Sequence, residues 1–158
     1  MAVLPDEYGQ FKKTYWTPSE RDNLKLVVGF VEGIKSKQFD EVLRAYADSP
    51  YIQHNRSIPS GISGVVETNR TLAKRFPEFT LIAKHVYVDG DFVTFHSHVT
   101  LSLKHRNDDQ KGLNVIDIWK IENGQIVEHW DAIQPLDFLT RFFFWVSGGA
   151  VKNQNGVF

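Results

Sequence analysis

The sequence contains no cysteine among its 158 residues, which excludes disulfide bonds, thiolate metal ligands and thiol catalysis. It also lacks an excess of charge of either sign, because 18 lysines and arginines stand against 19 aspartates and glutamates. A nucleic-acid-binding protein needs a basic stripe or patch on its surface. We therefore expect a protein that does not bind nucleic acid.

Long apolar runs are missing as well. No stretch approaches the ~20 apolar residues that a membrane-spanning helix requires. The N-terminal segment MAVLPDEYGQF has neither the basic start nor the apolar run of a signal peptide. These absences predict a cytoplasmic protein with no membrane partner.

The chain is rich in apolar side chains, since 42% of its residues are hydrophobic and 13% are aromatic. A chain of this length is most simply one domain, which buries roughly two thirds of its unfolded surface. We expect an N-terminal arm over residues 1–16, one domain over 17–136 and an apolar C-terminal extension over 137–158. The extension contains the run FFFWV (142–146), a large apolar patch that predicts a homodimer.

The first half of the chain carries helical signals. Thr17-Pro18-Ser19-Glu20 combines a capping residue, a proline suited to the first helical position and the glutamate of a capping box. Apolar residues follow at helical spacing as far as Ile34. Further along, the sequence predicts a helix over 39–46, a short strand over 51–54 and a third helix over 65–76.

From residue 79 the apolar residues recur with a period of two, which is typical of strands. We predict strands over 79–88 and 92–104, joined by the tight turn Asp89-Gly90. Two more follow over 113–121 and 125–133, joined by Asn123-Gly124. Helices followed by an antiparallel meander indicate an α+β fold, with three N-terminal helices packed on a curved antiparallel sheet.

Asp117 is unusual because it lies inside a predicted strand, between Ile116 and Ile118. A carboxylate in such a strand would carry a large desolvation penalty unless it is paired or neutral. One interpretation is a proton donor or hydrogen-bond donor at the floor of a cavity. The other is a structural acid paired with a histidine or a backbone amide.

A second polar pair lies near the end of the last predicted strand. The period of two places Val127, His129, Asp131 and Ile133 on one face of that strand. If this is the inner face, His129 and Asp131 enter an otherwise apolar cavity beside Asp117. In the opposite arrangement, Glu128 and Trp130 would face inward instead.

Three other histidines carry weaker signals. His54 follows a short strand, and its imidazole could accept a proton near neutral pH or could bond the backbone of the next loop. His96 and His98 share a polar strand face that we expect to meet solvent or a partner subunit. A metal site needs three or four convergent ligands, and no spacing such as H-E-x-x-H is present. We therefore expect neither a metal nor another cofactor.

Three segments resemble the SnoaL-like branch of the nuclear transport factor 2-like superfamily, which includes polyketide cyclases. They are YIQHN (51–55), VDGDFV (88–93) and DIWKIENGQIVEHWD (117–131). The resemblance covers roughly residues 20–135 and implies a cone-shaped α+β barrel. AYADSPYIQHN (45–55) and NVIDIWKIENGQIV (114–127) are also similar to segments of ketosteroid isomerases, which share this fold.

The isomerase resemblance implies roles for particular positions. His54 stands where the isomerases carry a general-base aspartate. Asp117 stands where they keep a neutral aspartic acid that donates a hydrogen bond to an oxyanion. Phe30 stands where they place a tyrosine, so that hydroxyl is missing here. The resemblance also puts His129 at a pocket-lining position.

Together these patterns predict a cofactor-free cyclase, isomerase or lyase acting on a small apolar carbonyl-containing substrate in the cone. Two alternatives stay open: a non-catalytic protein that holds an apolar ligand, and a dimerisation module whose cone is filled by side chains. The predicted catalytic residues are His54, Asp117, His129 and Asp131, and the predicted substrate-binding residues are Phe30, Val115, Trp119 and Ile133.

Overall fold

The structure, a computed structural model, describes residues 5–147 and 151–157. Residues 1–4 of the predicted arm, and 148–150 and 158 of the predicted extension, lie outside the described residues. In chain order the elements are α1 (Asp6–Gly9), α2 (Pro18–Lys35), α3 (Phe39–Ala45), β1 (Ile52–Gln53), α4 (Gly61–Arg75), β2 (Thr80–Asp89), β3 (Phe92–Thr100), a 3-10 turn (Leu103–His105), β4 (Leu113–Glu122), β5 (Gln125–Pro135) and α5 (Phe138–Ser147).

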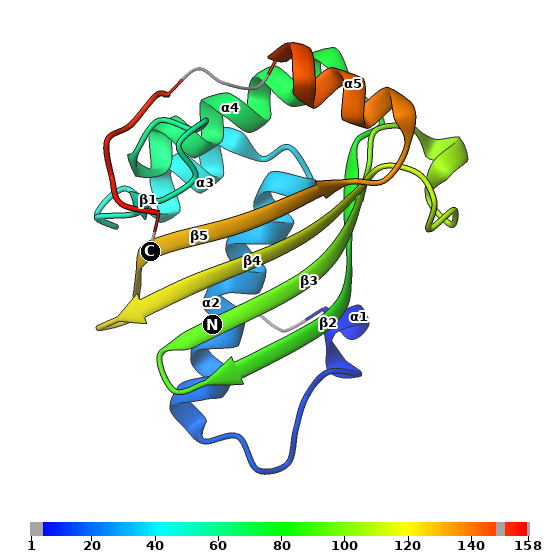
Figure 1. Cartoon of the computed structure of the whole chain (residues 1–158). Helices are drawn as coiled ribbons and strands as arrows, with labels where there is room; N and C mark the ends of the chain where they lie inside the picture. Colours follow the sequence, from blue (N-terminus) through cyan, green and yellow to red (C-terminus); the bar gives the residue numbers. More distant parts are fainter. Residues whose placement is uncertain (1–4, 148–150, 158) are drawn as a thin grey trace.

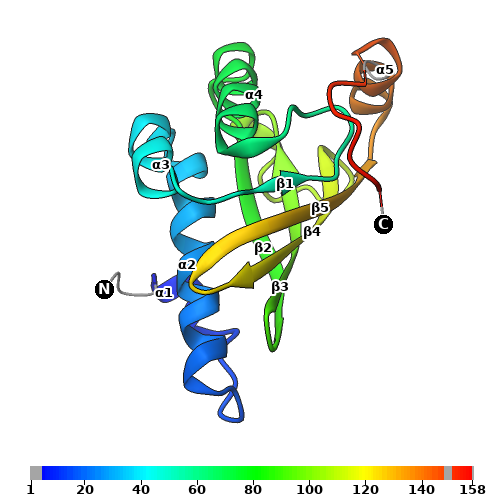
Figure 2. The same ribbon diagram turned by 90° about the vertical axis from the view of Figure 1, so that its left-hand side faces the viewer.

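Five strands form one curved, open sheet in the order β1-β5-β4-β3-β2. The four long strands pair antiparallel in chain order, whereas the two-residue strand β1 pairs parallel with β5. The sheet bends around α2, which lies behind it in Figure 1. Figure 2 shows α2 and α3 on one side of the sheet and α5 toward the other. The predicted α+β fold is therefore confirmed, with one parallel pairing added.

Helix α2 begins as the sequence predicts. The Glu20 backbone N–H donates to the Thr17 hydroxyl at 3.2 Å, and the Glu20 carboxylate accepts from the Thr17 N–H at 2.7 Å. This reciprocal capping box satisfies two amides that have no partner inside the helix. The helix then buries one face, including Val27, Phe30 and Val31, against the sheet and forms the centre of the core.

The described part of the predicted arm packs against α2. Tyr8 and Trp16 are buried, and the Tyr8 hydroxyl donates a hydrogen bond to the Glu32 carboxylate at 2.7 Å. Tyr15, in contrast, is 78% exposed. The apolar face of an amphipathic helix must be buried along its length, and Tyr8 and Trp16 of the N-terminal segment bury part of that face of α2.

The C-terminal segment has two distinct parts. Helix α5 packs Phe144 into the apolar cluster at one end of the sheet, while Phe138 and Trp145 remain exposed. Residues 151–157, which we call the C-terminal strap, run back beside β1 (Figure 1). Among residues 5–147 and 151–157, no helix is both long and apolar enough to cross a membrane.

Candidate active site

A polar cluster lies on the inner face of the sheet, where β4 and β5 pair. In this register Asp117 stands opposite Asp131, and Trp119 opposite His129. Alternation along β4 turns Asp117 and Trp119 inward, while Ile116 and Ile118 face out. The acid in the middle of the strand therefore points into the protein. His129 also lies on this inner side and is only 5% exposed.

A β-bulge interrupts the alternation on β5. Lys120 pairs with Glu128 and Ile121 pairs with Ile126, so Val127 is an extra residue on its strand. A bulge shifts the strand by one residue and reverses which side chains point inward. Ile126, which is fully buried, therefore shares the inner face with His129, and the prediction for Val127 is corrected.

His129 is held by hydrogen bonds at both of its ring nitrogens. Its Nε2 lies 3.2 Å from Oδ1 of Asp117, and its Nδ1 lies 3.1 Å from Oε1 of Gln53. Gln53 reaches this position because β1 pairs it with His129. All three side chains are buried, so each hydrogen bond is shielded from water and strengthened by the low local dielectric.

Asp131 is the half-buried member of the cluster. Its Oδ1 accepts a hydrogen bond from the Asn55 side-chain amide at 2.6 Å. Burial raises the pKa of Asp131 from 3.8 to about 6, and the neighbouring Asp117 charge adds to the rise, whereas His129 and the Asn55 hydrogen bond oppose it. A carboxylate tuned toward neutral pH is a stronger base than an ordinary aspartate.

Aromatic rings enclose His129. The Trp119 ring centroid lies 5.1 Å from that of His129, and the Tyr51 centroid lies 5.8 Å from it. Tyr51 also packs on Phe30, with 5.6 Å between ring centroids. Burial raises the pKa of Tyr51 well above 10, and the charges of Asp117 and Asp131 raise it further. Tyr51 therefore keeps its phenol proton, and its ring packs between Phe30 and His129.

The remaining predicted wall residues line the same side of the sheet. Val115 is buried two residues before Asp117 on β4, and Ile133 is its cross-strand partner on β5. Both belong to the apolar cluster at the end of the sheet nearest α5. The structure therefore brings the predicted Asp117, His129 and Asp131 together within one apolar surround.

His54 does not join them. Its ring stacks on Trp130 with 4.5 Å between centroids, and its Nε2 lies 3.0 Å from a Glu128 carboxylate oxygen. Glu128 and Trp130 alternate with His129 along β5 and so face the opposite side of the sheet. The expectation that His54 shares a cavity with Asp117 is corrected by this placement.

His96 and His98 also lie on the outer face. His96 Nδ1 lies 2.9 Å from Nδ1 of His85, and its Nε2 lies 2.6 Å from Oδ1 of Asn114. His98 is buried, with Nε2 2.7 Å from the Lys111 carbonyl oxygen. A hollow of about 410 Å³ opens beside these side chains. They are separated from His129 by the sheet and cannot complete a site with it.

One set of side chains within the described ranges could converge on a cation. Ligand atoms of Asp117, His129 and Asp131 all lie within 4.8 Å of one another. However, both ring nitrogens of His129 already have hydrogen-bond partners, one of which is Asp117 itself. We therefore describe the group as a hydrogen-bonded acid–base cluster and assign no metal to it.

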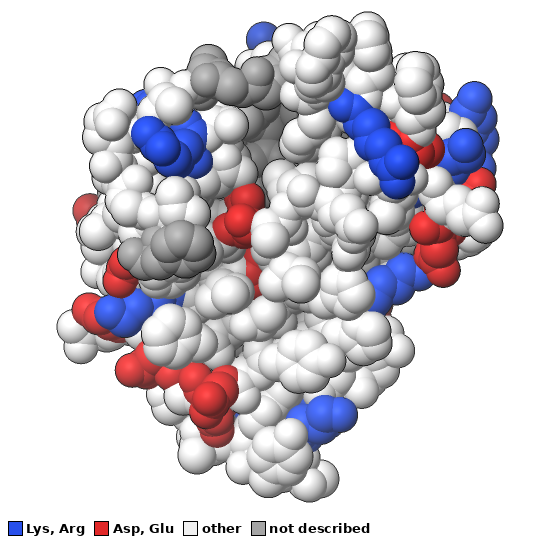
Figure 3. All heavy atoms as spheres, in the orientation of Figure 1, with Lys and Arg blue, Asp and Glu red and all other residues white. Residues whose placement is uncertain are grey.

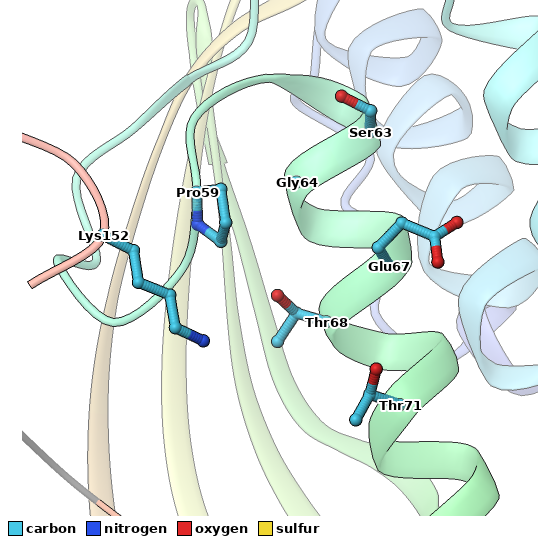
Figure 4. A pocket seen from close by; sticks show the side chains of 7 residues that line it. All are labelled: Pro59, Ser63, Gly64, Glu67, Thr68, Thr71 and Lys152. Atoms are coloured by element: carbon cyan, nitrogen blue, oxygen red, sulfur yellow. The ribbon is translucent and has the colours of Figure 1, made fainter. Parts of the chain in front are cut away.

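A second hollow lies away from the cluster. It measures about 450 Å³ and lies between α4 and the C-terminal strap, with Thr68, Thr71 and Lys152 among its lining residues (Figure 4). Its walls carry none of the predicted site residues. Gly64 also lines it, where an added Cβ would collide with the Pro59 carbonyl, so α4 packs directly on the preceding loop.

Sequence reasoning missed three functional candidates: Tyr51, Gln53 and Asn55. All three belong to the segment YIQHN, in which the sequence pattern indicates only His54. The strap holds this segment in place, because the Asn155 side-chain amide donates to the Gln53 carbonyl at 2.7 Å and that of Asn153 to the Asn55 carbonyl at 2.9 Å. The signal in the sequence that could have indicated these residues is the high proportion of polar side chains in the short predicted strand YIQHN.

Comparison with solved structures supports the fold. A candidate SnoaL-like polyketide cyclase from Jannaschia sp. is 17% identical with a TM-score of 0.60, covering 90% of this chain and 100% of that chain. A candidate polyketide cyclase from Bacillus cereus is 22% identical with a TM-score of 0.59, covering 75% and 76%. TsrD from Streptomyces laurentii is 19% identical with a TM-score of 0.56, covering 84% and 98%.

At these identities the structural matches establish the fold alone. A comparison with curated proteins finds no match. The family comparison is decisive, because residues 27–129 match the model of the SnoaL-like domain. That range runs from the middle of α2 to His129 in β5, and so includes Asp117 and His129 but not Asp131. The chain therefore belongs to the SnoaL-like family of the nuclear transport factor 2-like superfamily.

Proposed function

We propose that the protein is a cofactor-free acid–base enzyme of the cyclase, isomerase or lyase type, acting on a small apolar carbonyl compound. The observation that carries the proposal is the buried hydrogen bond between Asp117 and His129, with Asp131 opposite Asp117 in register. A carboxyl group of raised pKa beside a buried acid–histidine pair, in an apolar surround, is typical of sites that move protons.

The chemistry divides between the members of the cluster. Asp131 is the base: with a pKa of about 6 it is ionised at neutral pH yet binds a proton more strongly than an ordinary aspartate. It removes a proton from the carbon next to the carbonyl. The Asp117–His129 pair gives a proton to the carbonyl oxygen as negative charge develops there. The product is an enol, and return of a proton to a different carbon yields an isomer. Ring closure instead requires the enol carbon to form a bond to a second carbonyl carbon of the substrate, whose oxygen takes up a proton as the enol hydroxyl loses its own.

The surroundings suit an apolar substrate. Phe30, Val115, Trp119 and Ile133 surround the cluster with apolar surface. Asp131 is the most accessible of the three acid–base residues, so a substrate approaches from its side. The SnoaL-like polyketide cyclase and ketosteroid isomerase names among the structural neighbours support carbonyl chemistry as the class.

Enolisation can be tested without knowledge of the natural product. Small cyclic ketones are incubated with the full chain in deuterium oxide, and loss of the α-proton NMR signal measures proton exchange. We expect Asp131→Asn and Asp117→Asn to lower the exchange rate by about 10²–10⁴-fold, the usual contribution of a general base or acid. His96→Gln is the matched control, because it removes a hydrogen-bonded histidine from the outer face.

Two outcomes would count against the proposal. Exchange at equal rates in the wild type and both aspartate variants would remove the cluster from the chemistry. Saturable broadening of ketone signals without any exchange would favour the alternative of a non-catalytic ligand-binding protein.

We also propose that the protein forms a homodimer through its open sheet face and α5. The middle of that face carries few charged side chains (Figure 3). On α5, Phe138 is 82% exposed and Trp145 is 79% exposed. Apolar patches of this kind on a monomer mark contact surfaces. Sedimentation showing a monomer at micromolar concentration would refute the dimer.

A further inference from the structure

The side-chain amide of Gln53 has a fixed orientation. Gln53 is fully buried, and its Oε1 accepts a hydrogen bond from the Asn55 backbone N–H at 2.8 Å. A backbone N–H can only donate, so a flipped amide would set two donors against each other. The oxygen of Gln53, not its nitrogen, therefore faces His129.

This orientation determines which nitrogen of His129 carries a proton. The Nδ1 atom lies 3.1 Å from Oε1 of Gln53, and that oxygen can only accept. Nδ1 must therefore donate. The opposite tautomer would hold two lone pairs together in a fully buried place, where an unmade hydrogen bond is costly.

The consequence reaches Asp117. With a proton on Nδ1, the Nε2 of a neutral His129 is an acceptor, and it lies 3.2 Å from Oδ1 of Asp117. A hydrogen bond between these two atoms requires one further proton, either on the carboxyl group or on the ring. The pair is then an acid with one proton to give, and its net charge is zero in both forms.

We propose that Gln53 is a positioning residue that holds His129 in the form protonated at Nδ1, so that the Asp117–His129 pair keeps one shared proton. Its catalytic meaning rests on the proposed function, but the hydrogen-bond arrangement does not. Without Gln53, a neutral His129 is free to carry its single proton on Nε2 and donate it to an ionised Asp117. That arrangement has one proton fewer and cannot serve as the acid for an enolising carbonyl.

The cycle balances with these groups alone. Asp131 takes the proton from carbon as the C–H bond breaks, and the carbonyl oxygen takes the shared proton of the pair. The enzyme then holds a protonated Asp131 and an Asp117 carboxylate beside Nε2. Return of one proton to carbon at a new position, and of the other from oxygen to the pair, restores the starting state.

The test is the protonation of His129 in the full chain without any substrate. Protein labelled with ¹⁵N in its histidines is measured at neutral pH, and His129→Gln assigns the resonances. We expect the wild type to show a protonated Nδ1 on His129. Gln53→Leu should lose that proton and show a protonated Nε2. Gln53→Glu should restore the Nδ1 proton, because a carboxylate also accepts.

Amide-proton dispersion in the same samples shows whether each variant folds, and Gln53→Met replaces Gln53→Leu if the shorter side chain disrupts packing. An unprotonated Nδ1 in the wild type would overturn the proposal. So would an unchanged His129 signal in folded Gln53→Leu or Gln53→Met. A ketone-exchange assay that fails while the Nδ1 proton follows Gln53 would refute the proposed function and leave this inference standing.

Discussion

Asp131 is predicted to destabilise the protein at neutral pH. Burial holds its pKa near 6 in the folded protein against 3.8 in an exposed aspartate, so the folded state binds the proton more tightly than the unfolded state. Stability must then fall as pH rises between these two values, because the folded chain has to release a proton that the unfolded chain has already lost.

The magnitude follows from the shift. One pKa unit corresponds to about 1.4 kcal/mol, so a shift from 3.8 to about 6 costs the folded state about 3 kcal/mol above pH 6. Below pH 3.8 the cost is absent, because both states are protonated. Asp131→Asn removes the charge while keeping an oxygen that can accept the Asn55 amide proton. The variant should therefore be more stable than the wild type at pH 7 by up to about 3 kcal/mol.

The assay is urea unfolding of both proteins at pH 7 and again at low pH, where the wild type remains folded. The difference should be large at pH 7 and should shrink toward zero as pH falls through 6 and then 3.8. A variant that is equally stable at pH 7, or one whose advantage does not change with pH, would refute the reasoning. A gain in stability with a loss of ketone exchange would show that the protein maintains this buried charge for its chemistry.

Three further predictions concern the core, the N-terminal segment and the C-terminal strap. Phe95 is fully buried against Tyr8 and Trp119, so Phe95→Ala should lower the free energy of unfolding by about 3–5 kcal/mol, measured by urea unfolding. A loss below about 1 kcal/mol would contradict its place in the core. Tyr8→Phe should cost about 1 kcal/mol, since it removes only the hydrogen bond to Glu32, and an unchanged midpoint would argue against that contact. Removal of residues 151–158 should speed amide exchange in the segment YIQHN, because the strap donates two side-chain hydrogen bonds to it, whereas unaltered exchange would mean that the strap does not hold this segment.

Elements with strong local signals were predictable. The capping box at Thr17 is a contact between near neighbours, so its residues alone specify it. The turns Asp89-Gly90 and Asn123-Gly124 join strands whose alternation is set by residues two apart, and all four long strands begin within one residue of the predicted start. The second ends at Thr100, not at 104 as predicted, because a 3-10 turn follows over Leu103–His105. The inward placement of Asp117 follows from the same alternation.

Features that depend on long-range pairing were not predictable. The bulge at Val127 changed which residues of β5 face inward, and it arises from how two strands fit together. The location of His54 was likewise decided by a stack on Trp130 and a contact with Glu128, far along the chain. The family resemblance matched His54 to a general-base position, but it could not predict which side of the sheet the His54 ring faces.

The sequence by itself determined three of the helices, the meander and the presence of acids and histidines in apolar strands, because these depend on side-chain type at fixed local spacing. Only the tertiary structure decided which of these groups meet. Gln53 and His129 are 76 residues apart and come together through a parallel pairing of two residues that has no periodic signal. Hydrogen-bond partners, and with them the protonation of a buried site, are properties of the folded chain.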